Sequence, residues 1–153
     1  MEQEYKFTFE YYDSLDTLPA ADRQLVDKAR EACSRAYAPF SGFKVGAAAR
    51  LSSGKIISAA NQESVVFPAG TCAEQNLLTT WQSQYCNDPI ESMAITSMPG
   101  NTECHPCGIC RQVLNDTEKR QGSPIRIIMA SETEASIVST SAHLMPFNFK
   151  IKE

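Results

Sequence analysis

Three cysteines have the spacing of ligands to a single metal ion. Cys107 and Cys110 lie three residues apart at the start of an expected helix, where side chains at i and i+3 share a face. Cys72 begins another expected helix, and a helix N-terminus favours thiolates because its free backbone N–H groups stabilise negative charge. Three thiolates leave one position of a tetrahedral zinc ion open, as a catalytic zinc requires and a structural zinc does not.

Two other interpretations of these cysteines stay open. Cys104 lies three residues before Cys107 and would complete a closed structural site, although Pro106 disturbs the geometry that would aim these thiols at one point. A redox function is also compatible with Cys107-x-x-Cys110 taken alone. We interpret the cysteines and histidines without partners in a motif as structural or surface residues: Cys33, Cys86, Cys104, His105 and His143.

Glu74 is the candidate proton-transfer group. It follows Cys72 by two residues, and on an ideal helix this spacing turns two side chains about 200° apart. In the first turn, however, side chains can splay along the axis. A carboxylate there can therefore reach a water molecule bound to the metal and transfer its protons. The alternative is a carboxylate that only stabilises the helix N-terminus.

The composition favours one soluble domain. With 153 residues, of which 42% are hydrophobic, the chain is long enough to enclose one core and too short for two ordinary domains. The net charge of -4, without a cluster of lysine and arginine, argues against a nucleic-acid partner. The sequence has neither a signal peptide nor an apolar run of about 18 residues, so we expect no membrane segment and a cytoplasmic location.

The elements that position these residues follow from periodicity. Helical spacing of apolar residues predicts helices over 20–37, 72–85 and 108–120. β-prone runs predict strands over 43–51, 55–61, 90–98, 124–131 and 135–140, the first two joined as a hairpin through 52–54. Strands that alternate with helices predict an α/β fold, with a mixed sheet because the hairpin is antiparallel.

Two segments fall outside this alternation. Residues 61–71 contain proline and glycine without a clear period, which predicts a surface loop that carries binding groups. Residues 1–18 carry aromatics at alternating positions, which predicts an extended segment on the body of the protein or on a neighbouring subunit. We assign 1–19 as an N-terminal extension and 20–153 as one domain.

Several motifs occur together in one order. Cys72-Ala-Glu74 followed by Pro106-Cys-Gly-Ile-Cys110 is the two-part signature of the zinc deaminases. Around it lie YAPFSGFKVGAA at 37–48, Asn61-Gln-Glu63, PCGICRQVL at 106–114 and LMPFNF at 144–149. From about Ala20 to Phe149 the chain therefore resembles the cytidine deaminases, in particular the small homotetrameric type with three cysteines on zinc.

The resemblance implies a fold and an activity. The fold would be a three-layer sandwich, a mixed five-stranded sheet with helices on both faces. The activity would be that of a hydrolase that deaminates cytidine and 2′-deoxycytidine to uridine and 2′-deoxyuridine plus ammonia in pyrimidine salvage. One zinc ion per chain would be held by Cys72, Cys107 and Cys110, and Glu74 would move the protons.

The resemblance also assigns substrate residues. Asn61 and Glu63 would bind the ribose 3′-hydroxyl, Phe43 would line the nucleoside site, and the Ala73 backbone would meet the pyrimidine edge. Phe149 would reach the base in a neighbouring subunit, which implies a homotetramer with shared sites. Taken singly, Asn61 and Glu63 are equally compatible with loop capping, and Phe43 with the core.

Two positions concern the charge of the cysteine cluster. Arg111 matches an arginine of the family and would serve as a cation beside the sulfurs, although by itself it is compatible with an ordinary exposed helix residue. Gln75 departs from the family, which commonly has a second arginine there. Helix dipoles and neighbouring groups would then carry more of the charge balance.

Competing functions remain at this point. The same chemistry would serve a modified nucleoside or a nucleoside antibiotic, whereas a base within RNA or DNA requires a basic channel that this acidic chain lacks. From a different class, a closed site with four cysteines would make the chain a non-enzymatic, zinc-stabilised binding module.

Overall fold

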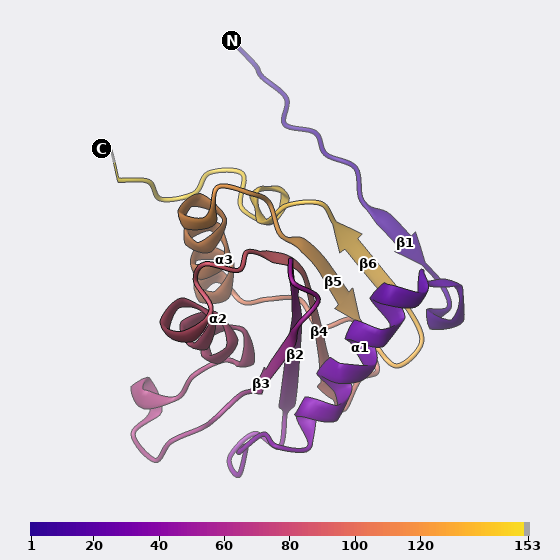
Figure 1. Cartoon of the computed structure of the whole chain (residues 1–153), viewed down its shortest axis with the longest axis vertical. Coiled ribbons are helices and arrows are strands. Elements are labelled where there is room, and N and C mark those ends of the chain that lie inside the picture. Colours follow the sequence, from indigo (N-terminus) through magenta and orange to yellow (C-terminus); the bar gives the residue numbers. More distant parts are fainter. Residues whose placement is uncertain (152–153) are drawn as a thin grey trace.

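The computed structural model describes residues 1–151, which form a sheet with helices on both sides (Figure 1). The strands are β1 (Glu10–Tyr12), β2 (Lys44–Leu51), β3 (Ile56–Ala60), β4 (Ile90–Met98), β5 (Arg126–Ala130) and β6 (Ala135–Val138). The helices are α1 (Ala20–Cys33), α2 (Ala73–Gln84) and α3 (Gly108–Gln121), with short 3-10 helices η1 (Leu15–Thr17), η2 (Phe67–Ala69) and η3 (Ser141–Leu144). The last two residues of the domain expected over 20–153 lie outside the described residues.

The strands form one mixed sheet in the order β1-β6-β5-β4-β2-β3. β4 and β5 run parallel, and the other neighbouring strands are antiparallel. The predicted mixed α/β sheet is confirmed, but the expected count of five strands is wrong, because the described residues form six. The additional strand is β1, in which Glu10 lies opposite Ile137 of β6. An extended segment with alternating side chains can pair with a free sheet edge in this way.

Alternating residues of the sheet pack against different helices, which gives three layers. Ala47 and Ala49 of β2 lie in one core with Leu77 of α2 and Leu114 of α3. Ala48, between them, lies in a second core with Leu25 and other residues of α1. Figure 1 shows α1 on one face of the sheet and the other two helices opposite it.

The segment after α1 turns toward the predicted surface loop. α1 ends at Cys33, before its predicted end at Tyr37, and the Ser34 N–H bonds to the carbonyls of Glu31 and Ala32. Tyr37 then forms an isolated bridge with Gln62. The segment from Tyr37 to the start of β2 and the loop over 61–71 are therefore held side by side.

The helices α2 and α3 begin at neighbouring points of the fold. α3 starts after the loop that leaves β4, and α2 starts after the loop that leaves β3. Asn76 of α2 donates from Nδ2 to the Ala60 carbonyl at 2.8 Å, which fixes the start of α2 beside the end of β3. This arrangement brings the first turns of the two helices together.

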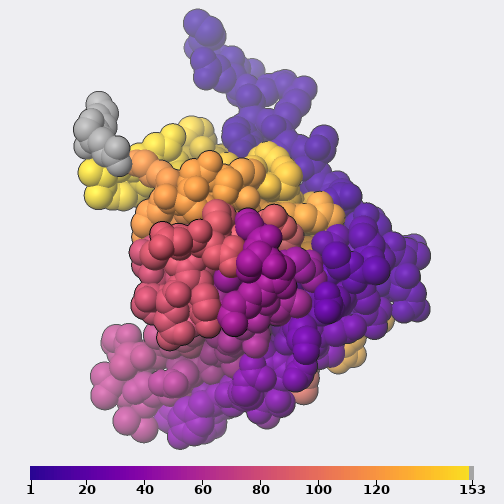
Figure 2. All heavy atoms as spheres, viewed as in Figure 1, coloured from indigo at the N-terminus to yellow at the C-terminus, as the bar shows by residue number. Residues whose placement is uncertain are grey.

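The N-terminal segment projects from the body of the molecule. Residues 1–9 are exposed and leave the body beyond β1 (Figure 2). Among residues 1–151, no helix has both the length and the apolar character that crossing a membrane requires.

Candidate functional site

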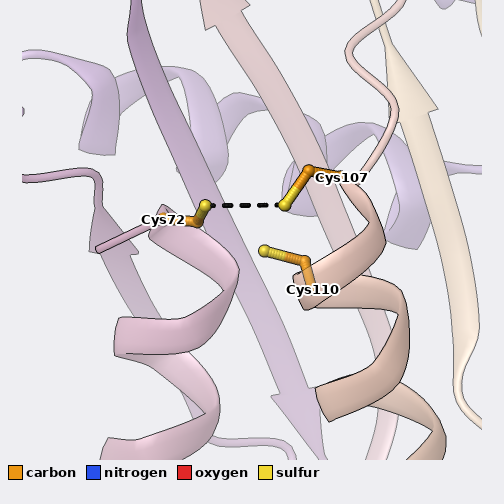
Figure 3. A group of neighbouring side chains, drawn as sticks. All are labelled: Cys72, Cys107 and Cys110. Carbon is orange, nitrogen blue, oxygen red and sulfur yellow. Dashed lines mark hydrogen bonds between the residues drawn. The ribbon is translucent and has the colours of Figure 1, made fainter. Parts of the chain in front are cut away.

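The three predicted metal ligands meet at the first turns of α2 and α3 (Figure 3). Cys72 is the N-cap of α2, Cys107 is the N-cap of α3, and Cys110 lies in the first turn of α3. The Sγ atoms of Cys72 and Cys107 are 3.7 Å apart, and all three Sγ atoms lie within 4.8 Å of one another. The N-termini of two helices therefore meet at one group of sulfurs.

This donor set fits a zinc ion. With a Zn–S bond of about 2.3 Å and tetrahedral angles, two sulfurs on one zinc lie about 3.8 Å apart. The 3.7 Å between Cys72 and Cys107 agrees with that value. Hydrogen bonds from the thiols of Cys110 and Cys107 lower the pKa of the Cys72 thiol to about 6. The hydrogen bond with Cys72 raises the pKa of the Cys110 thiol. A cluster that already holds one thiolate at neutral pH is prepared for a soft cation.

Cys104 stands apart from this group. Its side chain is buried against Ser97 and the sheet, and burial, followed by the nearby Glu74 charge, raises the pKa of its thiol to about 12. Among residues 1–151, the group of possible metal ligands consists of three cysteines and does not include Cys104. The geometry thus favours an open site over a closed site with four thiolates.

Glu74 lies beside the sulfurs and is almost completely buried. Its side chain is 3% exposed, and burial, with a smaller contribution from the Cys72 charge, raises the pKa of its carboxyl to about 7. Its own backbone N–H and the Cys110 thiol act in the opposite direction. A carboxyl with a pKa near neutrality can both accept and return a proton at physiological pH.

Cys72, Cys107 and Glu74 form part of the wall of a pocket of about 420 Å³, and Cys110 lies buried behind them. Four of the predicted substrate residues line the same pocket: Phe43, Asn61, Glu63 and Ala73. A volume of this size is in the range of small-molecule sites, which mostly enclose about 300–1,000 Å³. The fold thus brings together at one cavity residues that are far apart in the sequence: 43, 61–63, 72–75 and 107.

Asn61 and Glu63 hold the rim of this pocket in place. Asn61 accepts the Val45 N–H at 2.8 Å and donates to the Phe43 carbonyl at 3.0 Å. The Glu63 carboxylate accepts the N–H groups of Phe40 and Ser41 and the Ser41 hydroxyl. The Ser41 hydroxyl, followed by the Phe40 N–H, lowers the pKa of Glu63. Both side chains therefore orient the pocket rim while they remain part of the pocket wall.

Gln75 and Arg111 bond to the backbone around the cysteines. The Gln75 Oε1 accepts the Cys72 N–H at 3.1 Å, which completes a capping box at the start of α2. Arg111 donates from Nε to the Pro106 carbonyl at 2.8 Å and from Nη1 to the Leu144 carbonyl at 3.0 Å. The guanidinium thus joins the corner before Cys107 to η3.

Phe149 lies away from the pocket in a single chain. Its ring is 75% exposed, and its carbonyl accepts a long hydrogen bond of 3.5 Å from Gln112 of α3. It borders a larger, open hollow of about 1110 Å³ between α3 and the C-terminal segment. Within one chain, the structure does not bring Phe149 to the cysteines.

The structure adds His105 to the pocket wall, a residue that the sequence alone assigns to a structural or surface position. Its Nε2 lies 3.0 Å from the Glu103 carboxylate, which also accepts the Ser136 hydroxyl at 2.8 Å. The available signal is its position directly before Pro106-Cys107, at the entrance to the cysteine corner.

Comparison with known proteins agrees with this geometry. A model of the cytidine and deoxycytidylate deaminase zinc-binding region matches residues 19–121. Cytidine deaminase of Halalkalibacterium halodurans is 38% identical over 96 residues, which cover 61% of this chain and 70% of that protein. Cytidine deaminase 3 of Arabidopsis thaliana is 33% identical over 137 residues, which cover 88% of this chain and 60% of that protein.

Solved structures give the same result. The structure of cytidine deaminase from Burkholderia pseudomallei superimposes with a TM-score of 0.71 at 29% identity, over 82% of this chain and 97% of that chain. The structure of cytidine deaminase from Mycobacterium tuberculosis superimposes with a TM-score of 0.68 at 26% identity, over 87% of this chain and 100% of that chain. Each likeness thus covers more than four fifths of this chain.

Proposed function

The chain belongs to the cytidine and deoxycytidylate deaminase family, and from this membership we propose that it hydrolyses cytidine and 2′-deoxycytidine. Water would replace the 4-amino group, which gives uridine or 2′-deoxyuridine and ammonia, a reaction of pyrimidine salvage. As a member of this family the chain is a deaminase, a hydrolase of the C–N bond in a cyclic amidine. The observation that carries the proposal is the buried Glu74 carboxyl beside a group of three cysteine sulfurs, at the wall of a pocket of nucleoside size.

Cys72, Cys107 and Cys110 would hold one zinc ion per chain. When bound, the ion supplies a Lewis acid that makes water nucleophilic at neutral pH. The chain's own contribution at this point is geometric: two helix N-termini fix the sulfurs, and Gln75 and Arg111 fix the backbone that carries them. Three thiolates leave room for one further ligand, as catalysis needs.

Glu74 would move the protons of the reaction. Its carboxylate would take a proton from the attacking water and deliver protons to the ring nitrogen N3 and to the leaving amine, so that the C4–N bond breaks with release of ammonia. Burial supports this role, because a desolvated carboxyl with a pKa of about 7 exchanges protons readily near neutral pH. The burial of Glu74 would also keep bulk water away from its carboxylate.

The remaining pocket residues would bind the nucleoside. We assign Phe43 to contact with the nucleoside, the Ala73 backbone to the pyrimidine edge, and Asn61 and Glu63 to the ribose 3′-hydroxyl. Lone pairs of the Asn61 and Glu63 oxygens already accept N–H groups of the rim, so the ribose would join an existing hydrogen-bond network. A site built around such polar groups discriminates strongly against sugars that lack the hydroxyl.

We propose that the protein works in the cytoplasm as a homotetramer with shared sites. Phe149 would reach the base in a neighbouring subunit, an assignment supported by its exposed ring and by its distance from the pocket of its own chain. Residues 20–153 would form the catalytic domain and residues 1–19 an N-terminal extension of it.

The decisive experiment compares the wild-type protein with Glu74→Gln and with Glu91→Gln, a control on the exposed Glu91 of β4. Turnover is followed as loss of ultraviolet absorbance by cytidine and 2′-deoxycytidine, with zinc measured in each sample. We expect Glu74→Gln to lose turnover by about 10²–10⁴-fold or more while it keeps one zinc per chain, and the control to match wild type.

Other outcomes redirect the proposal. A zinc-loaded wild type that deaminates neither nucleoside contradicts the substrate assignment and points to modified nucleosides. Full turnover in Glu74→Gln contradicts the assignment of proton transfer.

A further inference from the structure

The segment before β1 is an extended arm that leaves its backbone unpaired. Residues 1–9 adopt no regular structure and are exposed, and they project beyond the body in Figures 1 and 2. Within residues 1–151, no backbone-to-backbone hydrogen bond involves residues 2–8. β1 itself is the first strand of the sheet and pairs on one side only, with β6. The arm and β1 together therefore offer a continuous free strand edge, which readily accepts another strand.

One face of this edge is aromatic. Tyr5, Phe7, Phe9 and Tyr11 occupy alternate positions, so they would share one face of an extended strand. Their rings form a row, with 6.3 Å between the centroids of Tyr5 and Phe7 and again between Phe7 and Phe9. His143 stacks on Phe7 at 5.1 Å, yet each of the four side chains remains 42–57% exposed. A row of half-exposed aromatics on a free edge is typical of an interaction surface.

The sequence of the arm is complementary to itself. We propose that residues 4–12 of two copies of this chain pair as antiparallel strands across a two-fold axis at Thr8. In this register Phe7 lies opposite Phe9 and Tyr5 opposite Tyr11, so each ring meets a ring of the other copy. On the other face Lys6 lies opposite Glu10, an opposite-charge pair that occurs twice by symmetry.

Other registers lose this match. If Phe7 lies opposite Phe7 of the other copy, Glu4 faces Glu10. If Lys6 lies opposite Lys6, two ammonium groups meet. Both registers are unfavourable because like charges directly opposite each other destabilise a strand pair. With Phe9 opposite itself, the pair between Lys6 and Glu10 disappears. A shift by one residue places the aromatic face of one arm against the polar face of the other.

The contacts within one chain leave this pairing possible. Lys6 pairs with Glu4 at 2.8 Å, but both side chains are more than 70% exposed, and such pairs contribute little. Glu10 binds Arg126 at 2.7 Å through one carboxylate oxygen, Oε2, which anchors β1 to the body. An arm of this length buries less than the roughly 800 Å² per partner of a standard interface, so we expect association in about the micromolar range.

Disulfide trapping tests both the contact and its register. In an antiparallel pair, residues directly opposite have Cα atoms about 4.5–5.5 Å apart, which suits a disulfide. Thr8→Cys places a thiol on the two-fold axis, opposite its own copy. Lys6→Cys is the matched control on the same face, because its two copies lie four residues apart along the strands, about 13 Å. The intact, zinc-loaded chain is oxidised mildly at about 50 µM, above the expected dissociation constant, and linked peptides are identified by mass spectrometry.

We expect Thr8→Cys to yield a peptide in which the two copies are linked through position 8, and Lys6→Cys to yield no peptide linked through position 6. Phe9→Ser in the Thr8→Cys background should slow formation of the linked dimer about tenfold at low protein concentration, because two ring pairs are lost. Absence of the link at position 8, or equal linking at positions 6 and 8, would overturn the proposal. A rate unaffected by Phe9→Ser would show linking by random collision and would overturn it as well.

Discussion

The Sγ atoms of Cys72 and Cys107 lie 3.7 Å apart although 35 positions separate them in the chain. Each residue is the N-cap of a helix, so the positive ends of two helix dipoles converge on the same sulfurs. This convergence stabilises negative charge on the three sulfurs. Both caps lie within residues 19–121, which match the zinc-binding region of the family.

The first prediction concerns which cysteines hold the metal. Cys110→Ser should weaken zinc binding by more than about 100-fold, because it removes one of three thiolates. Cys104→Ala should keep one zinc per chain, because Cys104 is outside the sulfur group and its loss leaves only a small cavity. Zinc content and competition with a chelator measure both effects. Loss of zinc from Cys104→Ala would instead indicate a site with four thiolates.

Much of the scaffold of this site could be predicted from the sequence. The strand predicted over 90–98 is confirmed as β4, and the helices predicted to begin at Cys72 and Gly108 are confirmed as α2 and α3. These elements follow from local periodicity and from helix signals such as the Pro106-Cys107-Gly108 corner, which act over a few residues.

The rest depends on contacts between distant segments. The partners of Glu63 lie at Phe40 and Ser41, which no spacing rule relates to a residue more than twenty positions later. β1 cannot be predicted as a strand of the sheet from local pattern, because its pairing depends on the free edge of β6. The place of His105 in the pocket wall has one local signal, its position directly before Pro106-Cys107, but a single histidine there does not by itself indicate a binding group.

The second prediction concerns Arg111. Arg111→Ala should destabilise the fold by about 1–3 kcal/mol, because the partly buried carbonyls of Pro106 and Leu144 lose their donor. For a chain of this size that corresponds to a fall of several degrees in the melting temperature, at about 2–4 °C per kcal/mol. Arg120→Ala is the control on the same helix, where the side chain is exposed and we expect a change within about 0.5 kcal/mol. Equal melting temperatures for the two variants would contradict a clamping role for Arg111.

The third prediction is a pH dependence from Glu63. Its pKa is lowered in the folded protein, so the carboxylate stabilises the fold above the usual pKa of about 4.3 and loses this effect as pH falls through the folded value. The difference in melting temperature between wild type and Glu63→Gln should therefore be large at pH 7 and shrink below about pH 4. Glu91→Gln, at an exposed position of β4, should show no such trend. A difference that is constant with pH would argue against a charged contact to Phe40 and Ser41.

The last prediction tests the packing of α1 on the sheet. A Cβ atom added at Gly46 of β2 would lie 1.9 Å from the Ala29 carbonyl oxygen and 2.9 Å from the Cys33 backbone nitrogen, so α1 or β2 must move. Because backbone atoms cannot yield as a side chain does, Gly46→Ala should destabilise the fold by about 3 kcal/mol. Gly108→Ala is the control, since a Cβ at this first residue of α3 meets nothing within 4 Å and alanine favours helix. Denaturant unfolding measures both variants, and a Gly46→Ala protein as stable as Gly108→Ala would show that α1 is not held at this distance.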